Sequence, residues 1–232
     1  MSSQTLLLRP EPGASESAAR ARALGLTPIL APLFTVRPLA WIPPDPAGFD
    51  ALLLTSANAL RHGGAGLARY RHLPVHAVGE ATAAAARQAG FADVRAGPAG
   101  VEALLRDVRS DARLLHLCGR EHIPQTRNGI HHLPVYASDA AEHLPPAAVA
   151  ALGEGALVLL HSPRAARLFA RLVAEAGIAR NSVRIAALSE AVAQAAGTGW
   201  ARLDAAPVPD DAILLKLAAR LLKVQDGGNG HD

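Results

Sequence analysis

The segment "ALVLLHSPRAARLF" (residues 156–169) passes from an apolar run through His-Ser-Pro into an amphipathic run. Earlier in the chain, "ALLLTSANALRHGG" (residues 51–64) follows nearly the same plan. An apolar run without polar alternation is typical of a strand buried on both faces of a parallel sheet. Each segment therefore predicts a buried strand that ends near a serine, Ser56 or Ser162, where a helix begins.

The same alternation of strand and helix continues on both sides of these segments, which predicts an α/β fold. Ala-, Leu- and Arg-rich stretches with helical spacing include "ESAARARALG", "EATAAAARQAG" and "DDAILLKLAARLLK". The predicted strands are "TLLLRP", "TPILAPLFTV", "ALLLTS", "VHAVGE", "DVRAG", "RLLHLCG", "LPVYAS", "ALVLLHS", "VRIAALS" and "ARLDAAP".

The chain contains an internal duplication. Residues 90–105 match residues 199–214 without a gap, and the match extends back to the two serine segments. The N-terminal unit "LLLRPEPGASESAARARALGLTPILAPL" resembles the unit that closes the first copy. The second copy has no such unit at its own end, so the N-terminal unit is the one that belongs to it. We therefore predict one discontinuous domain, residues 1–35 with 140–232, and an inserted domain, residues 36–139. The C-terminal "DGGNGHD" is predicted to be a solvated tail.

Composition excludes several function classes. The chain has 232 residues, of which 50% are hydrophobic and only 3% aromatic, as expected for a globular protein with an aliphatic core. The net charge of +3 is scattered and comes almost entirely from arginine, which predicts no nucleic-acid partner. The single cysteine, Cys118, excludes an internal disulfide. No apolar run reaches membrane-spanning length and no signal peptide is apparent, so we expect a cytoplasmic protein without a membrane partner.

Polar groups follow several predicted strands. Besides Ser56 and Ser162, these are Arg9-Pro10, Gly79-Glu80, Cys118-Gly119-Arg120 and Ser189-Glu190. A serine at this position caps the next helix in most proteins, a contribution of about 1 kcal/mol. Alternatively, because ligands of open α/β sheets bind at the carboxyl ends of strands, and helix N-termini attract anions, these groups would bind a polyanionic small molecule. Two domains facing each other with those ends would form its cleft.

Other sites receive less support from the sequence. The histidines at 72, 76, 116, 122, 131, 132 and 161 lack the helical i, i+4 spacing of a metal site, so no metal is predicted. "GGAGLA" (residues 63–68) follows a helix rather than a strand and is not a dinucleotide fingerprint. Of the two tyrosines, Tyr70 is predicted at the surface, and Tyr136 lies near a predicted domain crossing. Spacing alone assigns Tyr136 to packing or to the cleft.

Several motifs, in this order, resemble the uroporphyrinogen-III synthase family over nearly the whole chain. They are Arg9-Pro10, "TSANAL" (55–60), "AVGEATA" (77–83), "CGRE" (118–121), "VY" (135–136), "HSPRAARLF" (161–169) and "PDDAIL" (209–214). The resemblance implies two flavodoxin-like parallel-sheet domains, one of them discontinuous, joined by a two-stranded linker.

The resemblance also implies an activity, the cyclisation of the linear tetrapyrrole hydroxymethylbilane to uroporphyrinogen III, with loss of water and inversion of ring D. It implies no cofactor and a small-molecule substrate; we expect a monomer. Tyr136 matches the family's tyrosine that helps the hydroxyl group depart, so it is the predicted catalytic residue. The predicted substrate-binding residues are Arg9, Thr55, Ser56, Gly79, Thr82, Gly119, Arg120, Ser162 and Ser189.

The chain departs from the family pattern at two places. Ser189-Glu190-Ala191-Val192 replaces the family's Gly-Pro-x-Thr element, and Glu190 brings negative charge toward an anion site. The segment between Gly119 and Tyr136 is short, which predicts a truncated or absent helix there. Two alternatives therefore stay open: an inactive relative, or a two-domain binder of a polyanionic small molecule. A third alternative is a flavin- or nucleotide-binding relative of flavodoxin, but the chain lacks the phosphate-binding motif that this function requires.

Overall fold

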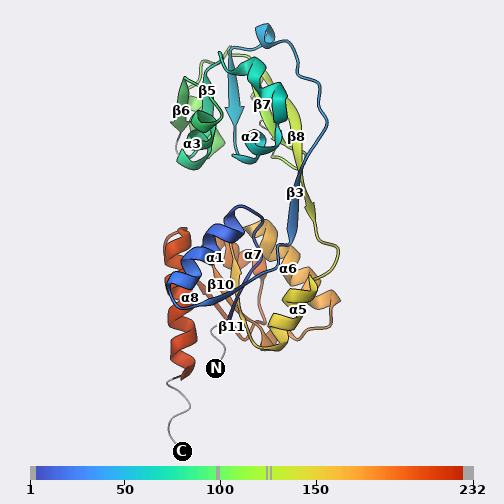
Figure 1. Ribbon diagram of the computed structural model, residues 1–232, viewed down its shortest axis with the longest axis vertical. Helices are drawn as coiled ribbons and strands as arrows, with labels where there is room; N and C mark the ends of the chain where they lie inside the picture. Colours follow the sequence, from blue (N-terminus) through green and yellow to red (C-terminus); the bar gives the residue numbers. More distant parts are fainter. Residues whose placement is uncertain (1–3, 98–99, 124, 126, 227–232) are drawn as a thin grey trace, which may run out of the picture. The chain divides into compact units, whose positions relative to one another are not determined.

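The computed structural model describes residues 4–97, 100–123, 125 and 127–226 (Figure 1). The chain divides into two compact units. Unit 1 combines the two ends of the chain, up to Thr35 and from Ala140 onward, and unit 2 is Val36–Asp139. Of the predicted C-terminal tail, residues 227–232 lie outside the described residues.

Unit 1 contains a five-stranded parallel sheet in the order β11-β10-β9-β1-β2. Relabelled along the unit, this is the 2-1-3-4-5 order of flavodoxin-like folds. The strands are β1 (Gln4–Leu7), β2 (Thr27–Leu30), β9 (Leu157–Leu160), β10 (Arg184–Ala187) and β11 (Arg202–Ala205). The helices are α1 (Gly13–Ala23), α5 (Pro146–Gly153), α6 (Pro163–Glu175), α7 (Glu190–Ala196) and α8 (Asp211–Asp226), with a 3₁₀ turn at Arg180–Ser182.

Helices cover both faces of the unit 1 sheet, which explains why its strands are apolar without alternation. Leu6, Val158 and Ile185 point to the core formed with α5, α6 and α7. Their neighbours Leu7 and Leu159 point to the opposite face, where α1 and α8 pack.

Unit 2 contains the six-stranded sheet in the order β3-β8-β7-β4-β5-β6. The strands are β3 (Phe34–Pro38), β4 (Ala51–Leu54), β5 (Val75–Val78), β6 (Val94–Gly97), β7 (Leu114–Gly119) and β8 (Ile130–Ala140). The helices are α2 (Asn58–His62), α3 (Glu80–Gln88) and α4 (Val101–Arg106), with 3₁₀ segments at Pro46–Gly48 and Gly64–Tyr70. The two boundaries between the units fall in β3 and at the end of β8, which are neighbours in the sheet.

The two sheets repeat one plan. The order β8-β7-β4-β5-β6 in unit 2 corresponds to β2-β1-β9-β10-β11 in unit 1, so the β7–β8 unit corresponds to the N-terminal β1–α1–β2 unit. The predicted α/β class with two parallel-sheet folds is therefore confirmed. The described residues between β7 and β8 form no helix, as the shortness of this segment predicts. Within the described residues, unit 2 thus has no counterpart of α1.

Two details of the sequence prediction are wrong. The run "TPILAPLFTV" is not one strand but two, β2 and β3, which belong to different sheets. β2 ends at Leu30, and Pro32, which has no N–H to donate, stands between it and the start of β3 at Phe34. Tyr70 is fully buried rather than at the surface: its hydroxyl donates to the Pro44 carbonyl at 2.8 Å, and its ring stacks on Trp41.

Candidate active site

A cavity of about 250 Å³ lies at the carboxyl ends of the unit 2 strands. This is where ligands of open α/β sheets bind, because the strands end there and the helices begin. Hydroxyl groups, imidazoles and one carboxylate dominate its polar lining. The lining residues are Thr55, Ser56, Val78, Val101, His116, Gly119, Glu121, His122, Ile123, Gln125 and Tyr136.

A larger cavity of about 530 Å³ adjoins the first, since Val101, Ile123 and Gln125 line both. Its lining adds two arginines, Arg106 and Arg127. The larger cavity contains none of the predicted site residues. The smaller one contains four of them, so we take the smaller cavity as the candidate active site.

Tyr136 is positioned by an irregularity in the pairing of β7 with β8. Cys118 pairs with Pro134, but Gly119 pairs with Tyr136, so one extra residue of β8 bulges out between them. A bulge redirects the side chains that follow it. The Tyr136 ring lies directly over Gly119, where an added Cβ would come within 2.9 Å of Cε2 and Cζ and 3.1 Å of the hydroxyl. Glycine at 119 is therefore needed for space.

The polar groups around Tyr136 come from three other segments. Thr55, directly after β4, has its Oγ1 3.0 Å from His116 Nε2. Ser56 Oγ accepts a hydrogen bond from the Asn58 N–H at 3.2 Å. The His62 ring at the end of α2 lies 6.3 Å from the Tyr136 ring, centroid to centroid. Burial, and secondarily Arg61, lowers the pKa of His62, which favours a neutral imidazole beside the tyrosine.

Three functional candidates escaped the sequence prediction. His62 was not singled out, and His116 and His122 were rejected because they lack helical spacing. His116 lies on β7, and His122 lies in the loop that follows it and bonds through Nδ1 to the Gly119 carbonyl at 3.0 Å. For His116 a topological signal exists, because His116 and His132 occupy paired positions on neighbouring strands.

The other predicted site residues of unit 2 do not line this cavity. Gly79 begins α3 with a φ of 77°, a conformation that favours glycine, and Thr82 in the first turn of α3 is buried. Arg120 is exposed and donates to Glu121 at 2.8 Å and to Asp139 at 2.6 Å. Asp139 also accepts from Arg37, so the positive charge of Arg120 is locally balanced by carboxylates.

In unit 1, Arg9 belongs to a charged cluster centred on Asp211, the first residue of α8. Arg9 donates to Ser17 at 3.1 Å and approaches Asp211 at 3.4 Å. Asp211 also accepts from Ser17, from Arg20 and from His161 Nε2 at 2.9 Å. Burial alone would raise the pKa of Asp211, but these hydrogen bonds outweigh it and hold the pKa well below its usual value.

The two predicted serines of unit 1 both stand at helix N-termini. Ser162 caps α6, because its Oγ accepts from the Ala165 N–H at 3.1 Å. Ser189 occupies the same position before α7 but makes no such capping bond. Glu190 is the first residue of α7, so its carboxylate stands where the helix dipole is positive.

The fold and the cavity define a class: an α/β protein with two flavodoxin-like units and a polar cavity at strand carboxyl ends. The family model described as "Uroporphyrinogen-III synthase HemD" matches residues 15–216. The chain belongs to this family, whose members are cyclising lyases of porphyrin and haem biosynthesis. The predicted resemblance is thereby confirmed.

Solved structures show the same fold. A uroporphyrinogen-III synthetase from Helicobacter pylori is 18% identical, with a TM-score of 0.66 over 95% of this chain and 100% of that chain. A mutant uroporphyrinogen III synthase from Thermus thermophilus is 17% identical, with a TM-score of 0.57 over 95% of this chain and 99% of that chain. None of the curated proteins matches the chain. No helix within the described part of the chain is long and apolar enough to cross a membrane.

Proposed function

We propose that this chain cyclises hydroxymethylbilane to uroporphyrinogen III and that Tyr136 is its catalytic residue. The observation that carries the proposal is the position of Tyr136 over Gly119, in a cavity lined by the hydroxyls of Thr55 and Ser56 at strand carboxyl ends. Family membership supplies the reaction, and the cavity supplies groups suited to it.

The proposed chemistry needs one proton donor and a great deal of positioning. The Tyr136 hydroxyl donates its proton to the departing hydroxyl group of the substrate, the C–O bond breaks, and water leaves. The pyrrole nitrogen supplies the electrons, which gives an azafulvene cation. This cation attacks the substituted carbon of ring D, and a spiro intermediate fragments and recloses with ring D inverted. The proton lost in the final closure restores the tyrosine hydroxyl, so the net change is loss of one water molecule.

Spontaneous closure gives the uninverted isomer, so the protein's main task is to hold the flexible chain for the harder bond. The substrate carries acetate and propionate groups, and hydroxyls, guanidinium groups and strand-end N–H groups bind carboxylates. We assign this role to the remaining predicted site residues. They are Thr55, Ser56, Gly79, Thr82, Gly119 and Arg120 in unit 2, and Arg9, Ser162 and Ser189 in unit 1.

We further propose that the protein works in the cytoplasm as a monomer, without cofactor, nucleic-acid or membrane partner. The scattered charge supports the absence of a nucleic-acid partner. The reaction itself is a loss of water with rearrangement, in which no electron acceptor takes part.

A second candidate is an inactive relative that binds a polyanionic tetrapyrrole without turning it over. Two observations favour it: Glu121 adds a carboxylate to the cavity lining, and Val192 stands where the family has threonine. A single assay separates the candidates. Enzymatically made hydroxymethylbilane is supplied, and the oxidised products are separated by chromatography. A synthase gives the type III isomer above the spontaneous background, whereas the type I isomer alone eliminates the enzyme and leaves the binder.

A further inference from the structure

The two faces of the unit 2 sheet are covered unequally. One face packs against α2, α3 and the 3₁₀ segment Gly64–Tyr70 in a large apolar cluster. Among the described residues, the apolar cluster on the other face is small: Ala51, Val108, Ala112 and Leu114 are its buried members. On this face the described residues between β7 and β8 form no helix, whereas α1 covers the corresponding part of the unit 1 sheet.

Histidine and cysteine side chains occupy this poorly covered face. His116 and Cys118 alternate with the core residues Leu115 and Leu117 along β7, so both point away from the large cluster. His132 is paired with His116 on the neighbouring strand β8. His116 is 1% exposed and Cys118 is 1% exposed, so these polar groups are buried where apolar side chains would be expected.

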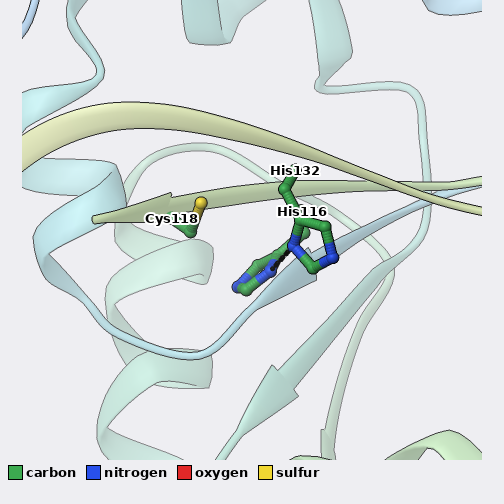
Figure 2. Close-up of side chains that lie close together, drawn as sticks. All are labelled: His116, Cys118 and His132. Atoms are coloured by element: carbon green, nitrogen blue, oxygen red, sulfur yellow. Dashed lines mark hydrogen bonds between the residues drawn. The ribbon is translucent and has the colours of Figure 1, made fainter. Parts of the chain in front are cut away.

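The three side chains converge. His116 Nδ1 and His132 Nδ1 lie 3.0 Å apart, as the dashed line in Figure 2 marks. One potential ligand atom of each of His116, Cys118 and His132 lies within 4.8 Å of those of the other two. Ligands of a tetrahedral zinc ion lie about 3.5 Å apart, so the most widely separated of these atoms must approach by about 1 Å. Small changes in the side-chain torsions of the three residues supply a movement of that size.

Neighbouring groups orient the imidazoles. Thr55 Oγ1 lies 3.0 Å from His116 Nε2, so a proton on Nε2 can be donated to the hydroxyl. His116 Nδ1 then accepts a hydrogen bond from His132 Nδ1, and metal binding would replace this hydrogen bond, with the His132 proton moving to its Nε2. The His122 ring stacks on His132 at 4.8 Å between centroids and meets His116 edge-on at 5.8 Å. Metal-binding histidines characteristically form a hydrogen bond through their second nitrogen, as His116 Nε2 does with Thr55.

The donor set selects the class of metal. Imidazole nitrogen and cysteine sulfur are the ligands of zinc and similar borderline-soft ions, whereas calcium and magnesium require oxygen ligands. A neutral imidazole keeps one unprotonated nitrogen, and in His116 that nitrogen is Nδ1 when Nε2 donates to Thr55. Cysteine binds zinc as the thiolate, so metal binding would release the Cys118 thiol proton.

We propose that unit 2 binds one zinc-class divalent cation through Nδ1 of His116, Nδ1 of His132 and the Cys118 sulfur, with solvent from the adjoining cavity as the fourth ligand. The ion links β7 to β8 on the face where unit 1 uses a helix. The sequence predicts no metal site because its criterion is spacing along one helix, and these ligands come from two paired strands.

The test uses the full chain, stripped of metal with a chelator and titrated with Zn²⁺ in a calorimeter. We expect one Zn²⁺ per chain and a higher melting temperature on binding. Cys118→Ser and His116→Ala should each weaken binding by about 10-fold or more. The control is His131→Ala, because His131 lies beside His132 but its ring packs on Phe49 instead.

A second measurement needs no variant. Co²⁺ added to the stripped wild-type chain should give the absorption of a tetrahedral ion with a thiolate ligand, and Cys118→Ser should remove the thiolate band. Absence of Zn²⁺ binding at micromolar concentrations would overturn the proposal. So would equal binding by the wild type and Cys118→Ser, or a Co²⁺ spectrum without thiolate character.

Discussion

Replacing Gly119 by alanine tests whether the position of Tyr136 controls the reaction. The added Cβ would meet Cε2 and Cζ of the tyrosine ring at 2.9 Å and its hydroxyl at 3.1 Å. Ordinary contacts between carbon atoms are about 3.5–4.0 Å, so the ring must retreat by roughly 0.5–1 Å. A displacement of about 1 Å at a reacting group costs up to about 100-fold in rate. We therefore expect Gly119→Ala to lower turnover by about 10- to 100-fold.

The assay is formation of the type III isomer from hydroxymethylbilane, with chemical denaturation run in parallel. Overpacking of this kind costs about 1–3 kcal/mol of unfolding free energy, so the variant should still fold. Gly48→Ala is the matched control in the same unit, because its Cβ would meet no atom within 4 Å. Turnover by Gly119→Ala within twofold of the wild type would refute the argument.

A double-mutant cycle locates the cause of the loss. If Gly119→Ala acts by displacing the tyrosine hydroxyl, it should cost little further turnover once that hydroxyl is already absent in Tyr136→Phe. Additive losses from the two substitutions would mean that Gly119→Ala damages the cavity in some other way. That result would contradict the explanation that the added Cβ displaces the Tyr136 hydroxyl.

Three further predictions concern the serines and Asp211. Ser162→Ala should lower the unfolding free energy by about 1 kcal/mol, because it removes the cap of α6. It should also raise KM. An unchanged KM with a lower melting temperature would show that Ser162 only caps the helix. Ser56→Ala should raise KM with a smaller loss of stability, since its hydroxyl accepts the Asn58 N–H but does not cap α2, whose cap residue is Ala57. Because the folded state holds Asp211 ionised, the unfolded chain binds its proton more readily, so wild-type stability should fall as pH drops below about 4. Asp211→Asn should flatten that fall, and an unchanged pH profile of chemical denaturation would contradict the cluster's contribution.

The alternation of strand and helix could be predicted because each strand is apolar on both faces. Leu6 and Leu7 in β1 are both fully buried, one on each side of the sheet. An unbroken apolar run therefore predicts a strand that is covered on both faces. The serine positions followed from the same pattern, since strand ends and helix starts are marked by turn chemistry. Ser162 indeed caps its helix.

The arrangement within the site could not be predicted, because it depends on contacts between strands far apart in sequence. The bulge that brings Tyr136 over Gly119 is one residue of irregular pairing between β7 and β8, and no local pattern marks it. The charge of Arg9 is shared with Asp211, two hundred residues away along the chain and adjacent only after folding. Tyr70 was misplaced for the same reason, since the Pro44 carbonyl that receives its hydroxyl lies in a distant loop.

Turnover by Tyr136→Phe is the most direct measurement of the central claim, that the phenol of this cavity assists departure of the substrate's hydroxyl group. Tyr70→Phe provides the control, because it removes the other tyrosine hydroxyl, which bonds to Pro44. We predict that Tyr136→Phe forms the type III isomer at least about 10-fold more slowly, with an unfolding free energy close to that of the wild type, while Tyr70→Phe loses stability but keeps its turnover. Wild-type turnover by Tyr136→Phe would contradict the assignment.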